Sequence, residues 1–186
     1  MKQNVLSEKN GFLIRKACVE DATDYYEQNY CPLDSELARL TGCKEIFTKE
    51  DVISFFLKSL NENNRYFFLI IAPDRKIVGE SIISDIDLEW RCAHFRIAIY
   101  HAADRGNGIG TWATEVTRDF AFAELKLHRL ELEVYSFNSR AEKTYLKAGF
   151  KREGVKRDAV IDGDKYADII LMSILENEWK ILKDIQ

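Results

Sequence analysis

The stretch that decides the fold runs from Ala93 to Ser136 and reads AHFRIAIYHAADRGNGIGTWATEVTRDFAFAELKLHRLELEVYS. It opens with alternating apolar and polar residues, which is typical of a β-strand with one buried face. A glycine-rich loop follows, and behind it apolar residues recur every three to four positions, as on the buried face of a helix. The stretch closes with a second alternating run at His128–Ser136. This strand–helix–strand order predicts a right-handed parallel crossover.

The segments on either side of this crossover predict an otherwise antiparallel sheet. Apolar patterns and turn signals indicate strands at 12–17, 65–72 and 77–88, a hairpin within 150–175, and helices at 19–30, 49–60 and 138–149. Asp162-Gly163 is a strong signal for the turn of that hairpin, and we expect residues 31–48 to be irregular. The prediction is an α/β fold: a mixed, mostly antiparallel sheet with a central parallel strand–helix–strand crossover, flanked by helices. With no repeat or linker, we expect a single domain over 1–186 with its core at about 12–175.

The composition excludes several classes of protein. No apolar run approaches the roughly 18–20 residues of a membrane helix, and the N-terminus lacks the core of a signal peptide, so we expect a cytoplasmic protein without a membrane partner. The cysteines Cys18, Cys31, Cys43 and Cys92 form no CxxC pair and have no histidine at metal spacing, which favours reduced thiols and no metal site. A net charge of −4 argues against nucleic acid as the main partner and suits a cationic substrate such as an amine.

Three of the chain's 9 glycines, Gly106, Gly108 and Gly110, lie in one loop. The dinucleotide fingerprint needs a further glycine where Thr111 stands, and the Walker loop needs a lysine that is absent, so the spacing excludes both. What remains is a phosphate loop that leads into a helix N-terminus, with Arg105 as an added cation. The alternative is a turn that only connects the strand to the helix.

Two ordered motifs carry a resemblance to a known family. The loop RGNGIG, from Arg105 to Gly110, resembles the Arg/Gln-x-x-Gly-x-Gly/Ala pyrophosphate loop of the GNAT superfamily of N-acetyltransferases. The later stretch LELEVYSFNSRAEKTYLKAGF resembles the second signature of that family, with matches at Asn138, Ala141, Tyr145, Gly149 and Phe150. FLIRKACVEDATDYYE near the N-terminus is similar to the family's first strand and helix, so the likeness covers roughly 12–175. The branch it most resembles holds the ribosomal-protein N-terminal (alanine/serine) acetyltransferases, with spermidine/spermine acetyltransferases as neighbours.

The resemblance implies acetyl-CoA as the donor, a primary amine as the acceptor, and no metal. It places the pyrophosphate on the backbone of Arg105, Gly106, Asn107, Gly108, Ile109, Gly110 and Thr111. It places pantetheine along the backbone of Ala98, Ile99 and Tyr100, where one N–H would polarise the thioester carbonyl. The Asn138 amide would hold pantetheine from the other strand, and Arg140 and Lys143 would neutralise the adenosine 3′-phosphate. The alternatives are a helix cap for Asn138 and a solvated basic helix face for the two cations.

For catalysis, the resemblance implies that Tyr145 protonates the departing CoA thiolate as general acid; a core aromatic is the alternative. The sequence indicates the general base less clearly, because the strand before the loop lacks the carboxylate that some members of the family have. Glu80 is our candidate base, and Asp85, Asp87 and His94 are alternatives. An α-amine needs less help from a base than an alkylamine, because its pKa is near 8 rather than near 10.

We therefore expect acetyl transfer to the N-terminal α-amine of a protein or peptide, by direct attack in a ternary complex. One alternative is a polyamine or aminoglycoside acetyltransferase, whose cationic substrate Asp34, Glu36 and Glu45 could line. A non-catalytic CoA-binding regulatory module is the other. The acceptor pocket is expected from 25–47 and the 158–166 hairpin, and edge strands near the C-terminus suggest a homodimer.

Overall fold

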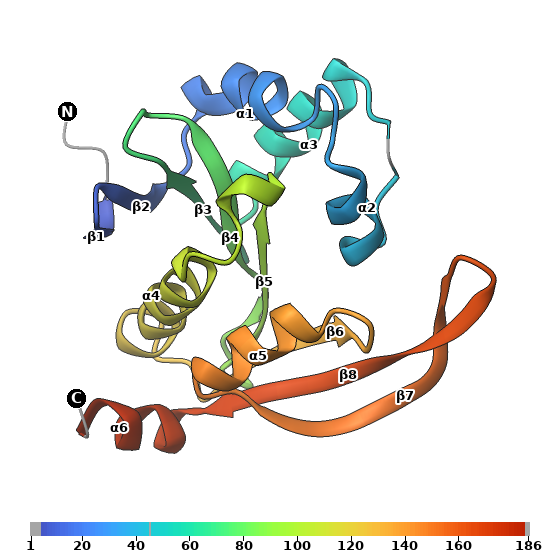
Figure 1. The fold of residues 1–186 in the computed structure, drawn as a ribbon. Coiled ribbons are helices and arrows are strands. Elements are labelled where there is room, and N and C mark those ends of the chain that lie inside the picture. The colour runs from blue at the N-terminus through green and yellow to red at the C-terminus, as the bar shows by residue number, and fades with distance from the viewer. Residues whose placement is uncertain (1–4, 45, 185–186) are drawn as a thin grey trace.

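The computed structural model describes residues 5–44 and 46–184. A sheet of eight strands in the order β1-β2-β3-β4-β5-β6-β8-β7 forms its centre (Figure 1). The strands are β1 (Val5–Lys9), β2 (Phe12–Lys16), β3 (Tyr66–Ile71), β4 (Ile77–Asp87), β5 (Cys92–Ile99), β6 (Arg129–Tyr135), β7 (Lys151–Asp162) and β8 (Lys165–Leu175). The α-helices are α1 (Ala22–Asn29), α2 (Ser35–Thr41), α3 (Lys49–Leu60), α4 (Ile109–Ala123), α5 (Ser139–Lys147) and α6 (Glu176–Asp184).

The predicted crossover is present, and it opens the sheet. Strands β5 and β6, joined through α4, are parallel, whereas the other strand pairs of the described residues are antiparallel. The parallel pairing starts at Cys92↔Arg129 and stops at His94↔Glu131, although β5 continues to Ile99 and β6 to Tyr135. The two strands therefore separate near the middle of the sheet. The expected α/β fold with a mixed, mostly antiparallel sheet is confirmed.

Each face of the sheet has its own hydrophobic core. On one face Phe95 and Leu130 pack with Trp112 of α4, and on the other Phe67 packs with Tyr25 of α1. Because side chains alternate along a strand, the odd-numbered residues of β5 face α4 and α5, and the even-numbered ones face α1 and α2. The separated part of β5 is thus accessible from two different layers of helices.

The structure adds elements that the sequence patterns did not predict. Strand β1 and helix α6 lie outside the predicted set, and α2 forms inside the segment expected to be irregular. The side chain of Asp34 accepts a hydrogen bond from the Leu37 N–H at 2.8 Å, which caps the start of α2. Gly42 ends it with a left-handed φ of 68°. Both signals are visible in the sequence, but the short apolar pattern between them is too weak to predict a helix alone.

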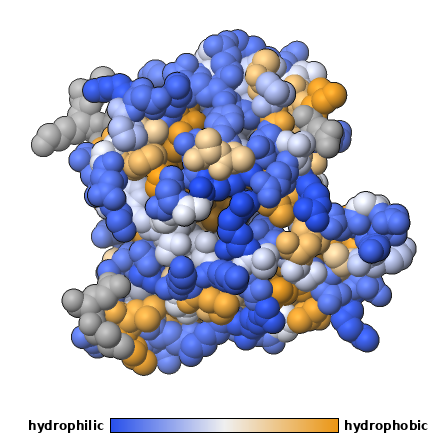
Figure 2. Space-filling model, in the orientation of Figure 1, coloured by the Kyte–Doolittle hydropathy of each residue, from blue (hydrophilic) through white to orange (hydrophobic). Residues whose placement is uncertain are grey.

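One face of the molecule, in the orientation of Figure 1, is mainly polar. Figure 2 shows mostly hydrophilic side chains on this face, interrupted by apolar residues around its hollowed centre. Among residues 5–44 and 46–184, no helix is both long enough and apolar enough to cross a membrane.

Candidate active site

A cavity of about 690 Å³ lies where β5 and β6 separate. Residues of β4, β5, β6, α2, α5 and the glycine loop line it. Most of the predicted site residues meet here: Glu80, Ala98, Ile99, Tyr100, Arg105, Gly106, Gly108, Gly110, Thr111, Asn138, Arg140, Lys143 and Tyr145. Asn107 and Ile109 are not among the lining residues. Segments from four parts of the chain thus form one site.

The glycines of the loop leave space on the cavity side. Gly106 and Gly108 have φ values of 84° and 85°, which glycine adopts without strain, and a Cβ on either would meet no atom within 4 Å. Gly110 lies inside α4, where a Cβ would contact only Ile99 Cγ1 at 3.8 Å. The protein itself therefore has room for a Cβ at Gly110.

Not every N–H of the loop is available to a phosphate. The Arg105 N–H donates to the Ala102 carbonyl at 3.2 Å, and the Ile109 N–H donates to Asn107 Oδ1 at 3.1 Å. The N–H groups of Gly110 and Thr111 precede the first intrahelical bond of α4, so they have no helical acceptor. The N–H groups of Arg105 and Ile109 are thus engaged within the chain, and Asn107 accepts its bond through the side chain. That the loop from Arg105 to Thr111 holds the pyrophosphate stays a prediction.

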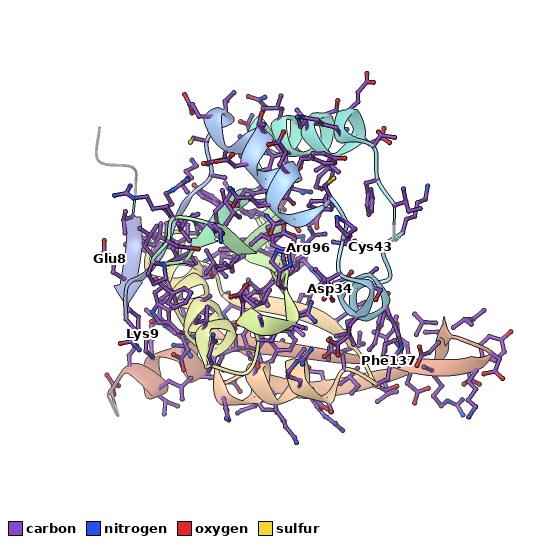
Figure 3. The ribbon with its side chains drawn as sticks, turned by 45° about the horizontal axis from the view of Figure 1, so that its top comes forward. Glu8, Lys9, Asp34, Cys43, Arg96 and Phe137 are labelled. Carbon is purple, nitrogen blue, oxygen red and sulfur yellow. The ribbon has the colours of Figure 1, made fainter. Side chains whose placement is uncertain are left out.

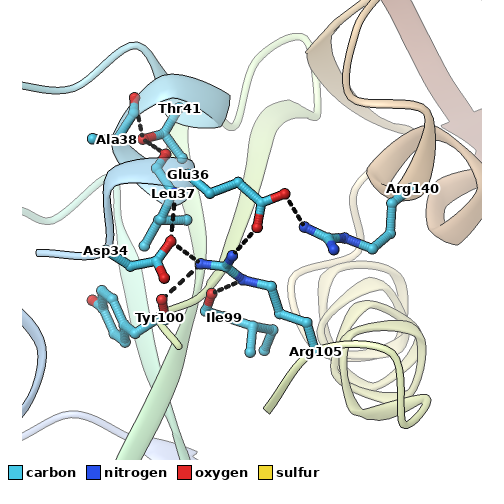
Figure 4. A network of polar contacts seen from close by, with 9 residues as sticks. All are labelled: Asp34, Glu36, Leu37, Ala38, Thr41, Ile99, Tyr100, Arg105 and Arg140. Carbon is cyan, nitrogen blue, oxygen red and sulfur yellow. Dashed lines mark hydrogen bonds and ion pairs between the residues drawn. The ribbon is translucent and has the colours of Figure 1, made fainter. Parts of the chain in front are cut away.

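The Arg105 side chain is paired with carboxylates of the chain itself, and its expected role as an added cation for the phosphate stays a prediction. Only 7% of it is exposed, and it donates to the carboxylates of Asp34 at 2.9 Å and Glu36 at 2.6 Å (Figure 4). It also donates to the carbonyls of Ile99 at 3.0 Å and Tyr100 at 2.7 Å. Burial favours a higher pKa for the Asp34 carboxyl, but hydrogen bonds from Arg105 and the Leu37 N–H lower it overall. Arg105 fixes α2 to the end of β5.

The backbone of β5 offers different groups from those predicted. The Tyr100 N–H donates to the Val78 carbonyl of β4 at 3.0 Å, and Ala98 pairs with Glu80 on that same strand. Because backbone groups point alternately to the two sides of a strand, those of Ala98 and Tyr100 face β4. Those of the odd-numbered residues, Ile97 and Ile99 among them, face the gap toward β6. Of the three predicted residues, only Ile99 directs its N–H into the gap.

Asn138 combines both roles considered for it. Its side-chain oxygen accepts a hydrogen bond from the Ala141 N–H at 3.2 Å, which caps α5. The residue also lines the cavity, and its amide nitrogen has no hydrogen-bond partner among the described residues. Nearby on α5, Arg140 approaches Glu36 of α2 at 3.5 Å (Figure 4). A ligand phosphate at this position would compete with Glu36 for Arg140.

Tyr145 lies on the inner face of α5, with only 7% of the residue exposed. Its ring packs near Phe95 and Phe150, with centroids 6.3 Å and 6.1 Å away. Its hydroxyl makes no hydrogen bond to the residues that the structure describes, and the residue lines the cavity. Burial raises the pKa of Tyr145 to about 12. The phenol is therefore neutral, and able to donate, over the whole range in which proteins work.

Glu80 is the centre of a buried network on the opposite face of the sheet. One carboxylate oxygen accepts from the Tyr25 hydroxyl at 2.6 Å and the Tyr100 hydroxyl at 2.7 Å, and the other accepts from Arg96 at 2.5 Å. The Tyr30 hydroxyl lies 3.0 Å from that of Tyr25 and extends the network. Burial, followed by the charge of Glu80, raises the pKa values of Tyr25 and Tyr100. The predicted base is at the cavity, but its oxygens are occupied.

The other candidate bases fall in two places. His94 lines the cavity, on the same side of β5 as Arg96. Asp85 and Asp87 lie toward the β4–β5 turn instead: Asp85 accepts from Ser84 Oγ at 2.8 Å, and Asp87 accepts from the Trp90 N–H at 2.8 Å. Neither is among the cavity-lining residues.

The expected acceptor segments contribute unequally. Helix α2 and the residues next to it supply Leu33, Leu37, Leu40, Thr41 and Cys43 to the cavity, whereas no residue of 158–166 lines it. The hairpin acts indirectly, since Asp162 accepts two hydrogen bonds of 2.6 Å from Arg39 of α2. Glu45 lies outside the described residues. The segment 25–47 was expected to form the pocket, but the sequence did not single out the apolar residues of α2, because no helix was predicted there. Across 5–44 and 46–184, no group of three or more His, Cys, Asp or Glu residues could hold a metal ion.

Comparisons with known proteins agree with this geometry. A family model described as "Acetyltransferase (GNAT) domain" matches residues 12–151. The probable N-acetyltransferase YjcK of Bacillus subtilis is 27% identical over 159 residues, which cover 82% of this chain and 81% of that protein. Spermidine N(1)-acetyltransferase of Vibrio cholerae is 26% identical over 132 residues, which cover 70% of this chain and 75% of that protein.

Solved structures share the fold. Spermidine N-acetyltransferase from Vibrio cholerae, in complex with CoA and spermine, superposes with a TM-score of 0.81 at 19% identity, covering 92% of this chain and 99% of that one. Ribosomal-protein-S5-alanine acetyltransferase from Vibrio fischeri gives a TM-score of 0.78 at 22% identity, covering 93% and 97%. Since the family model spans most of the sequence and both signature motifs meet at one cavity, the chain belongs to the GNAT family of acetyltransferases and is an acetyl-CoA-dependent N-acetyltransferase.

Proposed function

We propose that this enzyme acetylates the N-terminal α-amine of a peptide or protein, by direct attack on acetyl-CoA in a ternary complex. The observation that supports an acceptor with a single amine is the pairing of the carboxylates around the cavity. A polyamine carries several ammonium groups and needs unpaired carboxylates to bind them. Four nearby carboxylates of the described residues are paired with cations of the chain itself: Asp34 and Glu36 with Arg105, Glu80 with Arg96, and Glu133 with Lys156.

On the donor side, acetyl-CoA supplies the acetyl group as a thioester. The free N–H groups of Gly110 and Thr111, at the positive end of α4, suit the pyrophosphate. The gap-facing backbone of Ile97 and Ile99 suits the pantetheine amides, and one N–H there can polarise the thioester carbonyl. Among the described residues, Arg140 and Lys143 of α5 offer positive charge to the adenosine phosphate.

Proton transfers complete the reaction. As the amine nitrogen bonds to the acetyl carbon, the carbon–sulfur bond breaks, and Tyr145 donates its phenolic proton to the departing sulfur. Once CoA has left, the phenolate takes a proton from solvent, which restores neutral Tyr145. The neutral fraction of an α-amine with a pKa near 8 is substantial at neutral pH, so the demand on a base is small. Glu80 can receive the remaining proton through the hydroxyls of Tyr30, which lines the cavity, and Tyr25.

Acetylation of a polyamine is the second candidate. It is favoured by the relatives from Vibrio cholerae and Escherichia coli that are named as spermidine N(1)-acetyltransferases. Identities of 26% and 28% leave room for a different acceptor, and the paired carboxylates of this chain support an acceptor with a single amine.

A CoA-release assay with a panel of acceptors tests the proposal. The panel contains short peptides with free N-termini, the same peptides with blocked N-termini, spermidine, and an aminoglycoside. We expect turnover with the free N-termini only. Turnover of spermidine but of no peptide would overturn the proposal in favour of the polyamine. Tight binding of acetyl-CoA with no turnover of any acceptor would favour a CoA-binding regulatory module.

We propose further that the protein forms a homodimer through β7. This strand is at the edge of the sheet, projects with β8 beyond the rest of the molecule (Figure 1), and is largely exposed. One related structure is described as a dodecameric spermidine N-acetyltransferase from Vibrio cholerae, so assembly occurs in a protein of this fold. Light scattering after size-exclusion chromatography measures the mass; a monomer at micromolar concentration would refute the dimer.

A further inference from the structure

Arg96 is a basic residue inside the cavity that the mechanism above does not use as a binding group. It lies on β5 opposite Ile82 of β4, on the strand face that looks toward α1 and α2. The residue, labelled in Figure 3, lines the cavity, and 51% of its side chain is exposed. The Glu80 side chain to which it is bonded is only 3% exposed. A molecule that enters from this side therefore meets the guanidinium rather than the carboxylate.

The guanidinium of Arg96 has donors to spare. One terminal nitrogen donates to Glu80 at 2.5 Å, whereas its Nε and other terminal nitrogen donate to no described residue. Arg105, in the same cavity, differs in that all three of its nitrogens are engaged. The charge of Glu80 raises the pKa of Arg96, so the cation is permanent.

The position of Arg96 separates it from the donor site. The free N–H groups of Gly110 and Thr111 lie at the start of α4, beyond the end of β5. The backbone N–H groups of Ile97 and Ile99 point into the gap between β5 and β6. Arg96 points to the other layer, where α2 and the tyrosines around Glu80 form the wall. Its unused donors thus face the space left for the acceptor, not the space for CoA.

We propose that Arg96 selects acceptors with a carboxylate close to the reacting amine. A guanidinium is a planar fork that matches a carboxylate in two parallel hydrogen bonds. Within the proposed peptide acceptors, the carboxylate is the side chain of an Asp or Glu at the start of the peptide. A free amino acid, whose α-carboxylate has the same chemistry, is the other source, and it would widen the acceptor class beyond peptides. Arg96 also repels a second ammonium group, which disfavours polyamines. This inference rests on the proposed acetylation of an α-amine and names the class of acceptor.

Matched acceptors test the inference. One pair is a peptide amide that begins with Asp and its counterpart that begins with Asn; the other pair is a free amino acid and its amide. Each pair differs in the carboxylate and keeps the α-amine. Losing a hydrogen-bonded ion pair lowers kcat/KM by about 10- to 100-fold. We therefore expect kcat/KM to be higher by this factor for the acceptor with the carboxylate in at least one of the two acceptor pairs. The pair that shows it identifies the source of the carboxylate.

Variants of Arg96 test whether this residue binds the carboxylate of the acceptor or only holds Glu80 in place. In Arg96→Gln the preference within the pair should disappear, because kcat/KM falls for the carboxylate acceptor and changes far less for its amide. Arg96→Lys should keep part of the preference, and Arg75→Gln, on the exposed β3–β4 turn, should keep all of it. Thermal unfolding and acetyl-CoA affinity check that each variant is folded.

Two outcomes would overturn the inference. If the unaltered enzyme has equal kcat/KM values for the two members of each acceptor pair, the enzyme does not select for a carboxylate. An equal loss for both members in Arg96→Gln would show that Arg96 only supports Glu80. In either case acetylation of peptide α-amines would still stand. If only spermidine is acetylated, the proposed function fails and this inference fails with it.

Discussion

The guanidinium of Arg105 donates a 2.9 Å hydrogen bond to the carboxylate of Asp34, which lies 71 residues earlier in the chain. Through this contact the first residue of the glycine loop holds the start of α2, so the donor site and the wall of the acceptor site are mechanically connected. Asp34 also caps α2 through the Leu37 N–H, which gives one carboxylate two separable tasks.

Variants of Asp34 should resolve these two tasks. Asp34→Asn keeps a good helix cap but removes the charge, and we expect it to destabilise the fold by about 1 kcal/mol, because Arg105 retains its other acceptors. Asp34→Ala also removes the cap and should cost roughly a further 1 kcal/mol. Urea unfolding of the two variants measures both steps, and equal stability of the two would show that the cap contributes nothing.

Tyr145→Phe should lower kcat by about 100-fold, because a general acid contributes on this scale. Its affinity for acetyl-CoA should stay within about twofold, since packing against Phe95 and Phe150 is retained. Tyr66→Phe, a tyrosine of β3 outside the cavity, serves as the matched control and should retain full activity. A Tyr145→Phe enzyme with unchanged kcat would remove Tyr145 from the mechanism.

The dependence of kcat/KM on pH should reflect the raised pKa of the buried Tyr145 phenol. Because burial raises the pKa of Tyr145 to about 12, the donating neutral form persists well above the pH at which an ordinary tyrosine ionises. With a peptide acceptor, kcat/KM should rise as the α-amine loses its proton near pH 8 and stay level to about pH 10. A tyrosine with an ordinary pKa of about 10 would already have lost half its donors there. A decline that begins near pH 9, in enzyme shown to be folded at that pH, would contradict this assignment.

Gly110→Ala should separate ligand binding from folding. The new Cβ contacts only Ile99 at 3.8 Å, and alanine favours the helix by up to about 1 kcal/mol, so stability should hold or rise. If phosphate approaches this backbone, acetyl-CoA affinity should fall by about 10- to 100-fold, which calorimetry can measure. Gly149→Ala is the opposite case: its Cβ would lie 2.3 Å from Leu182 Cδ1 at a φ of 91°, so stability should fall. Unchanged affinity in Gly110→Ala would favour a loop that only connects strand to helix.

Asn138→Ser distinguishes the cap from the ligand contact. Serine caps a helix about as well as asparagine, so the free energy of unfolding should change by less than about 0.5 kcal/mol. The amide that could hold pantetheine is lost, so KM for acetyl-CoA should rise about tenfold. If neither quantity changes, Asn138 acts as a cap alone.

Local patterns in the sequence predicted the crossover, with its strand and the helix behind the glycine loop, well. Alternation along 93–102 and helical periodicity after Gly110 depend only on neighbours in the chain, and β5 and α4 form there. The prediction failed for α2, because seven residues give too little periodicity to outweigh a polar surrounding. It was incomplete for Ala98 and Tyr100, because the side to which a strand's N–H groups point depends on pairing with β4.

By itself, the sequence determined the order of strands and helices, the glycine loop, and the spacing of Asn138 and Tyr145, because these features depend on residues close together in the chain. Only the tertiary structure decided what the charged groups do. Arg105 is paired with Asp34 and Glu36, and Glu80 is enclosed by Tyr25, Tyr100 and Arg96. A side chain's charge is satisfied by whichever opposite group folding brings to it, and those partners come from distant segments that local patterns cannot bring together.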